Sequence, residues 1–198
     1  MRASTGAASS PRRVWVQLDA WMVGDAMVPL LAVGSTLEAG LRIRIDDAEE
    51  VEASTRPFMR LHDAESARWP PGPIYDLVGE VLPHPWHGWV IIDSGKFLAA
   101  AHESPSLPVG AMLRVQSQLS VDPMAWESDP PNQFVDGRRM WKVKELVVRQ
   151  APEHDRRPGS HPDLVLRHIE QMHLSNDIFL DDLTPRSWCD YLLDVEPQ

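Results

Sequence analysis

The chain has 198 residues, 43% of them hydrophobic and 24% charged, and a formal net charge of -10. No stretch reaches the ~18 uninterrupted apolar residues of a membrane helix, and the apolar fraction is too high for a wholly disordered chain. The acid excess makes nucleic acid an unfavourable partner. The single cysteine, Cys189, excludes an internal disulfide and a cysteine zinc site. We therefore expect an acidic, soluble, cytoplasmic protein with no membrane partner.

The N-terminal part of the chain predicts a tail followed by strands. Residues 1–12 are small and polar, and we expect a disordered tail there. Within the segment 13–68, Val14, Val16 and Leu18 occupy every second position. That period is typical of a strand with one buried face, so this segment is predicted to be β-rich.

Two segments of the chain resemble each other. Residues 31–37 read LAVGSTL and residues 107–113 read LPVGAML, and each continues into alternating apolar residues that end at Asp46 and Asp122. In both, a Val-Gly pair precedes a predicted strand, where glycine accepts the positive φ of a tight turn or bulge. The likeness has two interpretations, an internal duplication or two ordinary β-turns.

A proline-rich break at 69–73 is the best internal boundary, because prolines neither continue a helix nor donate to a sheet. Strand-like runs follow, and Asp93-Ser94-Gly95 is typical of a hairpin turn. These runs are 77–82, 89–93, 96–101 and 139–150. Many short strands with few helices predict a mainly β fold, a small barrel or a sandwich. The segment 74–150 resembles an OB-type barrel in its pattern.

The segment 151–198 is predicted to be a linker followed by a two-helix extension. Ser160 and Pro162 are typical of a helix start, with Ile169 and Met172 in its apolar stripe. Thr184 and Pro185 give a second start, since a hydroxyl caps the helix and proline fits its first turn. Trp188, Tyr191 and Leu192 follow at the spacing of one helix face.

The tryptophans are unusually many, eight against two tyrosines and four phenylalanines. Trp15, Trp141 and Trp188 lie in periodic segments and are predicted to be core residues. Trp86 and Trp89 lie in the loop sequence PHPWHGW, where an indole face could stack on a ligand. We therefore predict a non-enzymatic binding module that recognises a protein or a small ligand through loops at one barrel end, with Trp86, Trp89 and His87 in contact.

A metal-dependent enzyme is the first alternative. His84, His87, Asp93 and His102 are close in sequence and could supply imidazole and carboxylate ligands to a divalent metal. Pro85 excludes a regular helix there, so the spacing does not match a zincin motif. The chain has no nucleophile elbow, phosphate-binding loop or dinucleotide fingerprint. No catalytic residue and no cofactor other than this possible metal is predicted.

Single-stranded nucleic-acid binding is the second alternative. The run 138–149 is the most basic stretch of the chain, and its strand pattern interleaves cations with an aromatic ring. The residues that would contact nucleic acid are Arg138, Arg139, Trp141, Lys142 and Lys144. The same pattern is typical of the solvated face of an edge strand, where lysines discourage aggregation. Nothing in the sequence predicts an oligomeric state.

Overall fold

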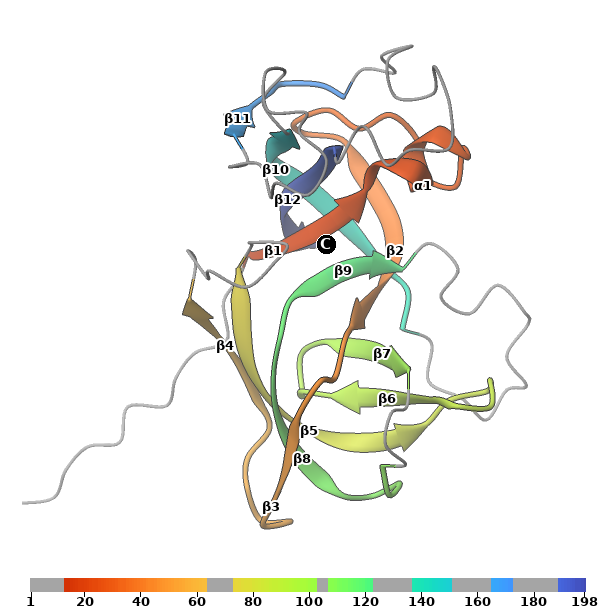
Figure 1. The fold of residues 1–198 in the computed structure, drawn as a ribbon, viewed down its shortest axis with the longest axis vertical. Coiled ribbons are helices and arrows are strands. Elements are labelled where there is room, and N and C mark those ends of the chain that lie inside the picture. The colour runs from red at the N-terminus through yellow and green to blue at the C-terminus, as the bar shows by residue number, and fades with distance from the viewer. Residues whose placement is uncertain (1–12, 64–72, 103–106, 123–136, 151–164, 173–188) are drawn as a thin grey trace, which may run out of the picture.

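The computed structural model describes residues 13–63, 73–102, 107–122, 137–150, 165–172 and 189–198 (Figure 1). These residues form one 12-stranded sheet and one short helix, α1 (Ala20–Gly24), so the prediction of a mainly β protein is confirmed. The strands are β1 (Val14–Asp19), β2 (Thr36–Ile43), β3 (Ala48–Val51), β4 (Phe58–Asp63), β5 (Ile74–Pro83), β6 (Trp89–Asp93), β7 (Leu98–His102), β8 (Met112–Ser117), β9 (Leu119–Asp122), β10 (Arg139–Gln150), β11 (Val165–His168) and β12 (Cys189–Pro197). No described helix is long and apolar enough to cross a membrane.

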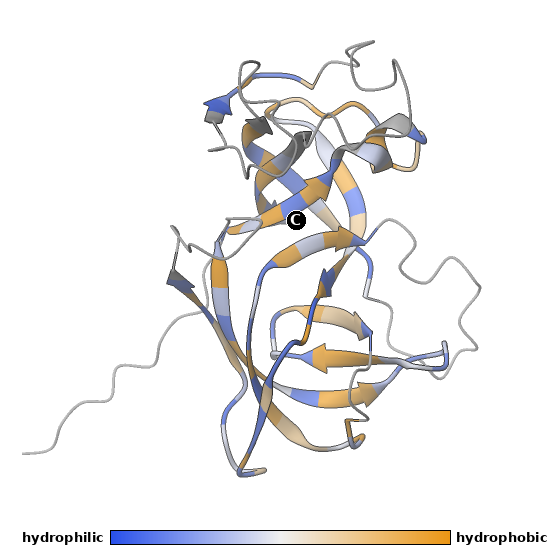
Figure 2. Ribbon diagram, viewed as in Figure 1, coloured by the Kyte–Doolittle hydropathy of each residue, from blue (hydrophilic) through white to orange (hydrophobic). Residues whose placement is uncertain are grey.

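Alternating side chains explain where the strands form. In β1 the apolar residues Val14, Val16 and Leu18 are buried, whereas the residues between them are half-exposed. Figure 2 shows a similar alternation of hydrophobic and hydrophilic residues along β2 and β10, whereas β6 and β7 are hydrophobic over most of their length. The predicted hairpin turn is also present: Gly95 has a φ of 85°, and its N–H donates to the Asp93 carboxylate at 2.7 Å. Local sequence therefore sets most of these elements.

Within the described residues the predicted C-terminal helices are not seen, and this part of the fold prediction was wrong. Residues 189–197 form β12, which pairs with β1 on one side and β10 on the other. Tyr191, Leu193 and Val195 are buried in the core at every second position, so long-range pairing prevailed over the local helix spacing. Residues 165–168, inside the other predicted helix, form β11 against β10. The predicted caps at 160–162 and 184–185, and Trp188, lie outside the described residues.

Strands from the predicted segments 13–68 and 74–150 belong to the same sheet. β2 pairs with β7, β9 and β10, and β1 pairs with β9. The predicted boundary at 69–73 and the tail at 1–12 lie almost wholly outside the described residues. The division into domains therefore stays a prediction.

The two Val-Gly turns have the same backbone conformation. Gly34 and Gly110 have φ angles of 90° and 88°, which a residue with a side chain rarely adopts. Each turn is closed by the same hydrogen bond, from Ser35 N–H to the Ala32 carbonyl and from Ala111 N–H to the Pro108 carbonyl. In each turn the glycine N–H also donates to the backbone carbonyl of one residue on a partner strand. The N–H of that same residue donates to the carbonyl of the residue after the glycine. These residues are Val143 of β10 for the first turn and Val81 of β5 for the second.

The likeness extends to whole strands and their registers. Trp141 of β10 lies opposite Leu37 of β2, as Gly79 of β5 lies opposite Leu113 of β8. The pairs β10–β12, β12–β1 and the parallel β1–β9 likewise correspond to β5–β6, β6–β7 and the parallel β7–β2. We call β10, β12, β1 and β2 the terminal group, and β5, β6, β7 and β8 with β9 the central group.

The terminal group is assembled from both ends of the chain, so the strand order of the two groups is related by a circular permutation. The groups exchange strand ends, because β2 runs from β10 of its own group to β7 of the other. The antiparallel pair β2–β9 joins them at the centre. In Figure 1 the terminal group lies above and the central group below.

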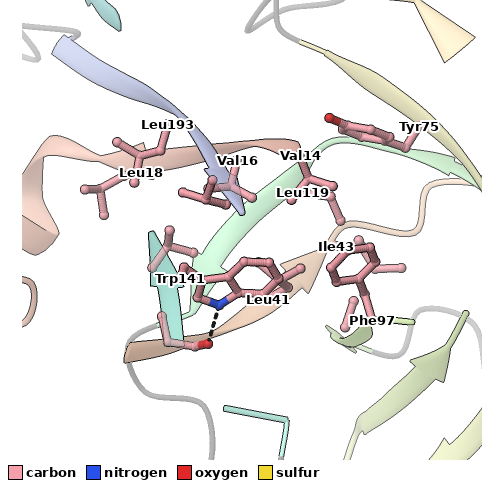
Figure 3. Close-up of a cluster of buried hydrophobic side chains, with 14 of the residues drawn as sticks. Val14, Val16, Leu18, Leu41, Ile43, Tyr75, Phe97, Leu119, Trp141 and Leu193 are labelled. Atoms are coloured by element: carbon pink, nitrogen blue, oxygen red, sulfur yellow. Dashed lines mark hydrogen bonds between the residues drawn. The ribbon is translucent and has the colours of Figure 1, made fainter. Parts of the chain in front are cut away.

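The core continues across this junction. Trp141 is fully buried, donates its indole N–H to the Ala39 carbonyl at 2.9 Å, and stacks on Phe97 at a centroid distance of 5.6 Å (Figure 3). The Tyr75 hydroxyl accepts the Trp15 N–H at 2.8 Å. Trp141 and Trp15 belong to the terminal group, Tyr75 belongs to the central group, and Phe97 directly precedes β7 of the central group. These contacts therefore join the two groups in one core.

Candidate functional site

Four rings cluster where the loop after β5 enters β6. The centroid of the Trp89 ring lies 5.7 Å from that of His84 and 6.2 Å from that of Trp86. His102 is the cross-strand partner of Trp89, and their rings meet edge to face at 5.3 Å. Trp86 and Trp89 are half-buried, and His102 is exposed. Neighbouring rings therefore position the Trp89 indole and leave part of it accessible.

The loop itself is fixed by the first of its histidines. The Trp86 N–H donates to Nδ1 of His84 at 3.0 Å. Burial lowers the pKa of His84, and this effect outweighs the hydrogen bond from Trp86, which raises it. His84 is consequently neutral near pH 7, with Nδ1 as an acceptor. His87, two residues before Trp89, is exposed.

A cavity of about 590 Å³ adjoins the ring cluster, a volume typical of small-molecule sites. Trp89 and His102 line it, but the other predicted contact residues, Trp86 and His87, are not among its described lining. The rest of the wall comes largely from β1, β2 and the β8–β9 region. It includes Gln17, Asp19, Arg42, Arg44, Gln118 and Ser120.

The cavity lies where the terminal and central groups meet. Gln17 lies opposite Leu192 as His102 lies opposite Trp89, so Gln17 and His102 hold equivalent positions. Both line the cavity. Two further lining pairs are equivalent in the alignment of 31–46 with 107–122, namely Arg42 with Gln118 and Arg44 with Ser120. The wall is thus built from matching positions of the two groups with different side chains.

Charged side chains on this wall are paired. Asp19 Oδ1 accepts from Gln17 Nε2 at 2.8 Å and its Oδ2 from the Trp21 indole N–H at 3.2 Å. Arg42 lies 3.9 Å from Asp19 Oδ2, which is an ion-pair distance but too long for a hydrogen bond. Arg44 Nε donates to Asp46 Oδ1 at 2.7 Å. The wall thus offers hydrogen-bonding groups without an excess of either charge.

The predicted metal ligands are only partly brought together. His84 and His102 both contact the Trp89 ring. Asp93 is at the far end of β6 from Trp89, roughly 13 Å along the strand, and its carboxylate is bonded to Gly95. Within the described residues, no group of three or more His, Cys, Asp or Glu side chains could hold a metal ion. The metal alternative stays a prediction.

In the basic strand β10, Lys142 and Lys144 alternate with the buried Trp141 and so lie on the opposite face, whereas Arg139 shares the face of Trp141 at the start of the strand. Arg138, Arg139 and Lys142 are exposed, and Lys144 pairs with Glu196 at 2.7 Å. Trp141 is 2% exposed, so its ring is a core residue and is not accessible to a nucleobase. Any nucleic-acid contact of this strand would therefore use the cations without base stacking on Trp141.

A second polar cluster was missed by the sequence reasoning. It is centred on the buried Asp76 of β5. Its neighbours on the adjacent strands, Arg60 of β4 and Gln116 of β8, both donate to the Asp76 carboxylate. Burial alone would raise the pKa of Asp76, but the hydrogen bonds from Arg60 and Gln116, with the charges of Arg60 and His62, hold it below its usual value. His62 is the extra residue of a β-bulge, 3.4 Å from Asp76.

This cluster lines a smaller cavity of about 460 Å³. Asp46 and Gln116 line both cavities, so the two are neighbours on the molecule. Arg60 and Gln116, which donate to Asp76, lie on the two strands adjacent to it, which indicates that Asp76 holds β4, β5 and β8 together. No local motif marks these residues, because they are brought together only by strand register.

Comparison with known proteins found no matching family model, no matching curated protein and no matching solved structure.

Proposed function

We propose that this protein is a non-enzymatic binding module that takes a small ligand in the cavity beside Trp89. The observation that carries the proposal is that Trp89 is half-buried and lines a cavity of about 590 Å³. An indole without such a cavity would be no more than a packing residue. The wall is mostly polar and carries one indole, so it can offer a small ligand both hydrogen bonds and an apolar surface.

The fold proposed for this function is a pair of OB-like small barrels, one for each strand group. Each group has an antiparallel run of strands, and each also makes one parallel pairing with a strand of the other group, β1 with β9 and β7 with β2. In this proposal the ligand binds between the barrels, beside the loop end that carries Trp86 and Trp89. A ligand there would contact both groups at once.

The test is a fragment screen on the ¹⁵N-labelled chain, in which the tryptophan indole N–H resonances are observed. We expect the Trp89 indole resonance to shift with at least one fragment, and Trp89→Phe and Trp89→Ala to weaken that binding progressively. Val109→Ser is the control, because Val109 is 61% exposed at a turn and does not line the cavity. If no fragment shifts Trp89, the proposed cavity site is wrong.

A second variant separates the two kinds of partner that the loop could recognise. His87 is exposed in the loop but is not among the described residues of the cavity wall. His87→Ala should therefore leave small-ligand binding unchanged within about twofold. If it abolishes binding, the loop surface itself is the contact site, as a protein partner would require.

A further inference from the structure

We infer that the ligand of this cavity is a neutral, hydroxyl-rich ring, which is the chemistry of a saccharide; this inference rests on the proposed function. The first observation is the charge on the wall. Arg42 and Arg44 are matched by Asp19 and Asp46, each within 4 Å of its partner. A charged ligand would lie near a side chain of the opposite charge and one of the same charge at once, so the wall favours a ligand without net charge.

The second observation is the gap between Arg42 and Asp19. Their nearest atoms are 3.9 Å apart, and the two side chains are 34% and 24% exposed. A hydroxyl group is both a donor and an acceptor, so one hydroxyl can accept from the guanidinium and donate to the carboxylate. Asp19 already accepts from Gln17 and Trp21, which leaves about two of the roughly four acceptor positions of a carboxylate.

Further polar groups surround this gap. The Gln17 amide nitrogen donates to Asp19, and the oxygen of the same amide is an acceptor. On the same wall, Ser120 already donates to the Arg42 carbonyl at 3.4 Å and can accept, and His102 can donate or accept. Several adjacent hydroxyls on one ring would therefore find partners without displacing the existing hydrogen bonds.

The third observation is the position of the indole. Trp89 lines the same cavity as Arg42 and Asp19, and neighbouring rings hold it in place. A sugar ring has an apolar C–H face and a rim of hydroxyls, so one face can lie on the indole while the rim reaches the polar wall. A nucleobase is apolar on both faces and gains most from stacking on each; the described wall offers one indole, and its isoleucines, Ile43, Ile45 and Ile74, are buried.

The experiment compares three ligand classes on the same protein. The probes are a panel of neutral methyl glycosides and disaccharides, the nucleosides adenosine and cytidine, and inorganic phosphate, each titrated against the full chain while the Trp89 indole resonance is observed. We expect saccharides to shift Trp89, with a dissociation constant that changes less than about twofold between low and moderate salt, because no charge is bound.

Variants at the carboxylate test the hydroxyl bridge. Asp19→Asn keeps the size of the side chain and removes two acceptor positions, so saccharide affinity should fall at least about tenfold, and Asp19→Glu should restore part of it. Val109→Ser is again the control. Unfolding curves of each variant show whether the fold is intact, and only variants with wild-type unfolding are compared.

Each outcome decides one of the two statements. Binding of saccharides that depends on both Trp89 and Asp19 supports the inference. If nucleosides or phosphate shift Trp89 and saccharides do not, the inference is overturned while the proposed cavity site stands. If no probe and no fragment shifts Trp89, both are overturned.

Discussion

Replacing Tyr75 by phenylalanine tests the junction between the two strand groups. The Tyr75 hydroxyl accepts the backbone N–H of Trp15 at 2.8 Å, and Tyr75 itself is 2% exposed. Phenylalanine keeps the ring and removes only the acceptor, so the Trp15 N–H loses this partner. Losing one partner of a hydrogen bond in such a setting costs about 1–3 kcal/mol. We expect Tyr75→Phe to lower the free energy of unfolding at pH 7 by that amount.

The same substitution should change the alkaline limb of the stability curve. Burial raises the pKa of Tyr75 from 10.0 to about 12, against a lowering effect of the bond from Trp15. The unfolded chain therefore releases this proton from about pH 10, and the folded chain holds it until about pH 12. The contribution of the Tyr75 phenol to the free energy of unfolding is therefore fully present below pH 10. Above pH 10 it is lost by ~1.4 kcal/mol per pH unit, and by about 3 kcal/mol in total.

The measurement is urea unfolding of the wild type and Tyr75→Phe at intervals from pH 7 to pH 11.5, followed by circular dichroism. The difference in unfolding free energy should be constant up to about pH 9.5 and then shrink as the wild type loses stability faster. Parallel loss of stability in the two proteins above pH 10 would show that the phenol is not buried at the junction. Equal stability at pH 7 would show that the bond to Trp15 does not hold the groups together.

Two further substitutions test how the central group is built. Asp76→Asn should weaken the fold by roughly 1–3 kcal/mol at pH 7, because Asp76 is buried and Arg60 loses its charged partner. Since the lowered pKa of Asp76 stabilises the fold above the pKa of the unfolded chain, that contribution is lost below about pH 4. Acid unfolding curves of wild type and variant should converge there, and a constant gap would contradict the assignment. Gly79→Ala should be the most damaging, because its Cβ would lie 2.7 Å from the Asp93 carbonyl oxygen, and a cost above about 3 kcal/mol is expected in urea unfolding. Gly34→Ala has no neighbour within 4 Å and should cost only about 1–2 kcal/mol through its positive φ; equal losses for the two would refute the close-approach argument.

Strands were predictable where the local pattern admits one interpretation. The alternation at Val14, Val16 and Leu18 has no helical counterpart, and β1 forms there. The segment after Trp188 carries two patterns at once, a helix spacing at Tyr191 and Leu192 and an alternation that includes Leu193. Pairing with β1 and β10, which lie far away in the chain, selected the alternation. Local sequence does not contain that partner, so the prediction of a helix was wrong for a physical reason.

The candidate site likewise combines residues that local sequence predicts with residues that only strand pairing brings together. Trp89 was predicted because its loop concentrates indole and imidazole rings within a few residues. Asp19, Arg42 and Ser120 carry no local signal, since they reach the cavity only through the pairing of β1, β2 and β9. One signal could have found part of the wall: the alignment of 31–46 with 107–122 places Arg42 beside Gln118 in register.

The internal likeness of the two groups is retained at their turn glycines and at some core positions, although others differ, as Trp141 and Gly79 do. At the turns, where the backbone requires a positive φ, the equivalent residues Gly34 and Gly110 are the same. Leu37 and Leu113 are likewise the same and are both buried in the core.

The equivalent cavity pairs are all different, and they are Gln17 with His102, Arg42 with Gln118, and Arg44 with Ser120. Identical pairs would offer a ligand two equal orientations related by the internal symmetry. The unlike pairs, together with an indole at 89 where the other group has the buried Leu192, allow one orientation to bind better than the other. In the proposed complex, Trp89 and Arg42 would therefore contact different parts of one asymmetric ligand.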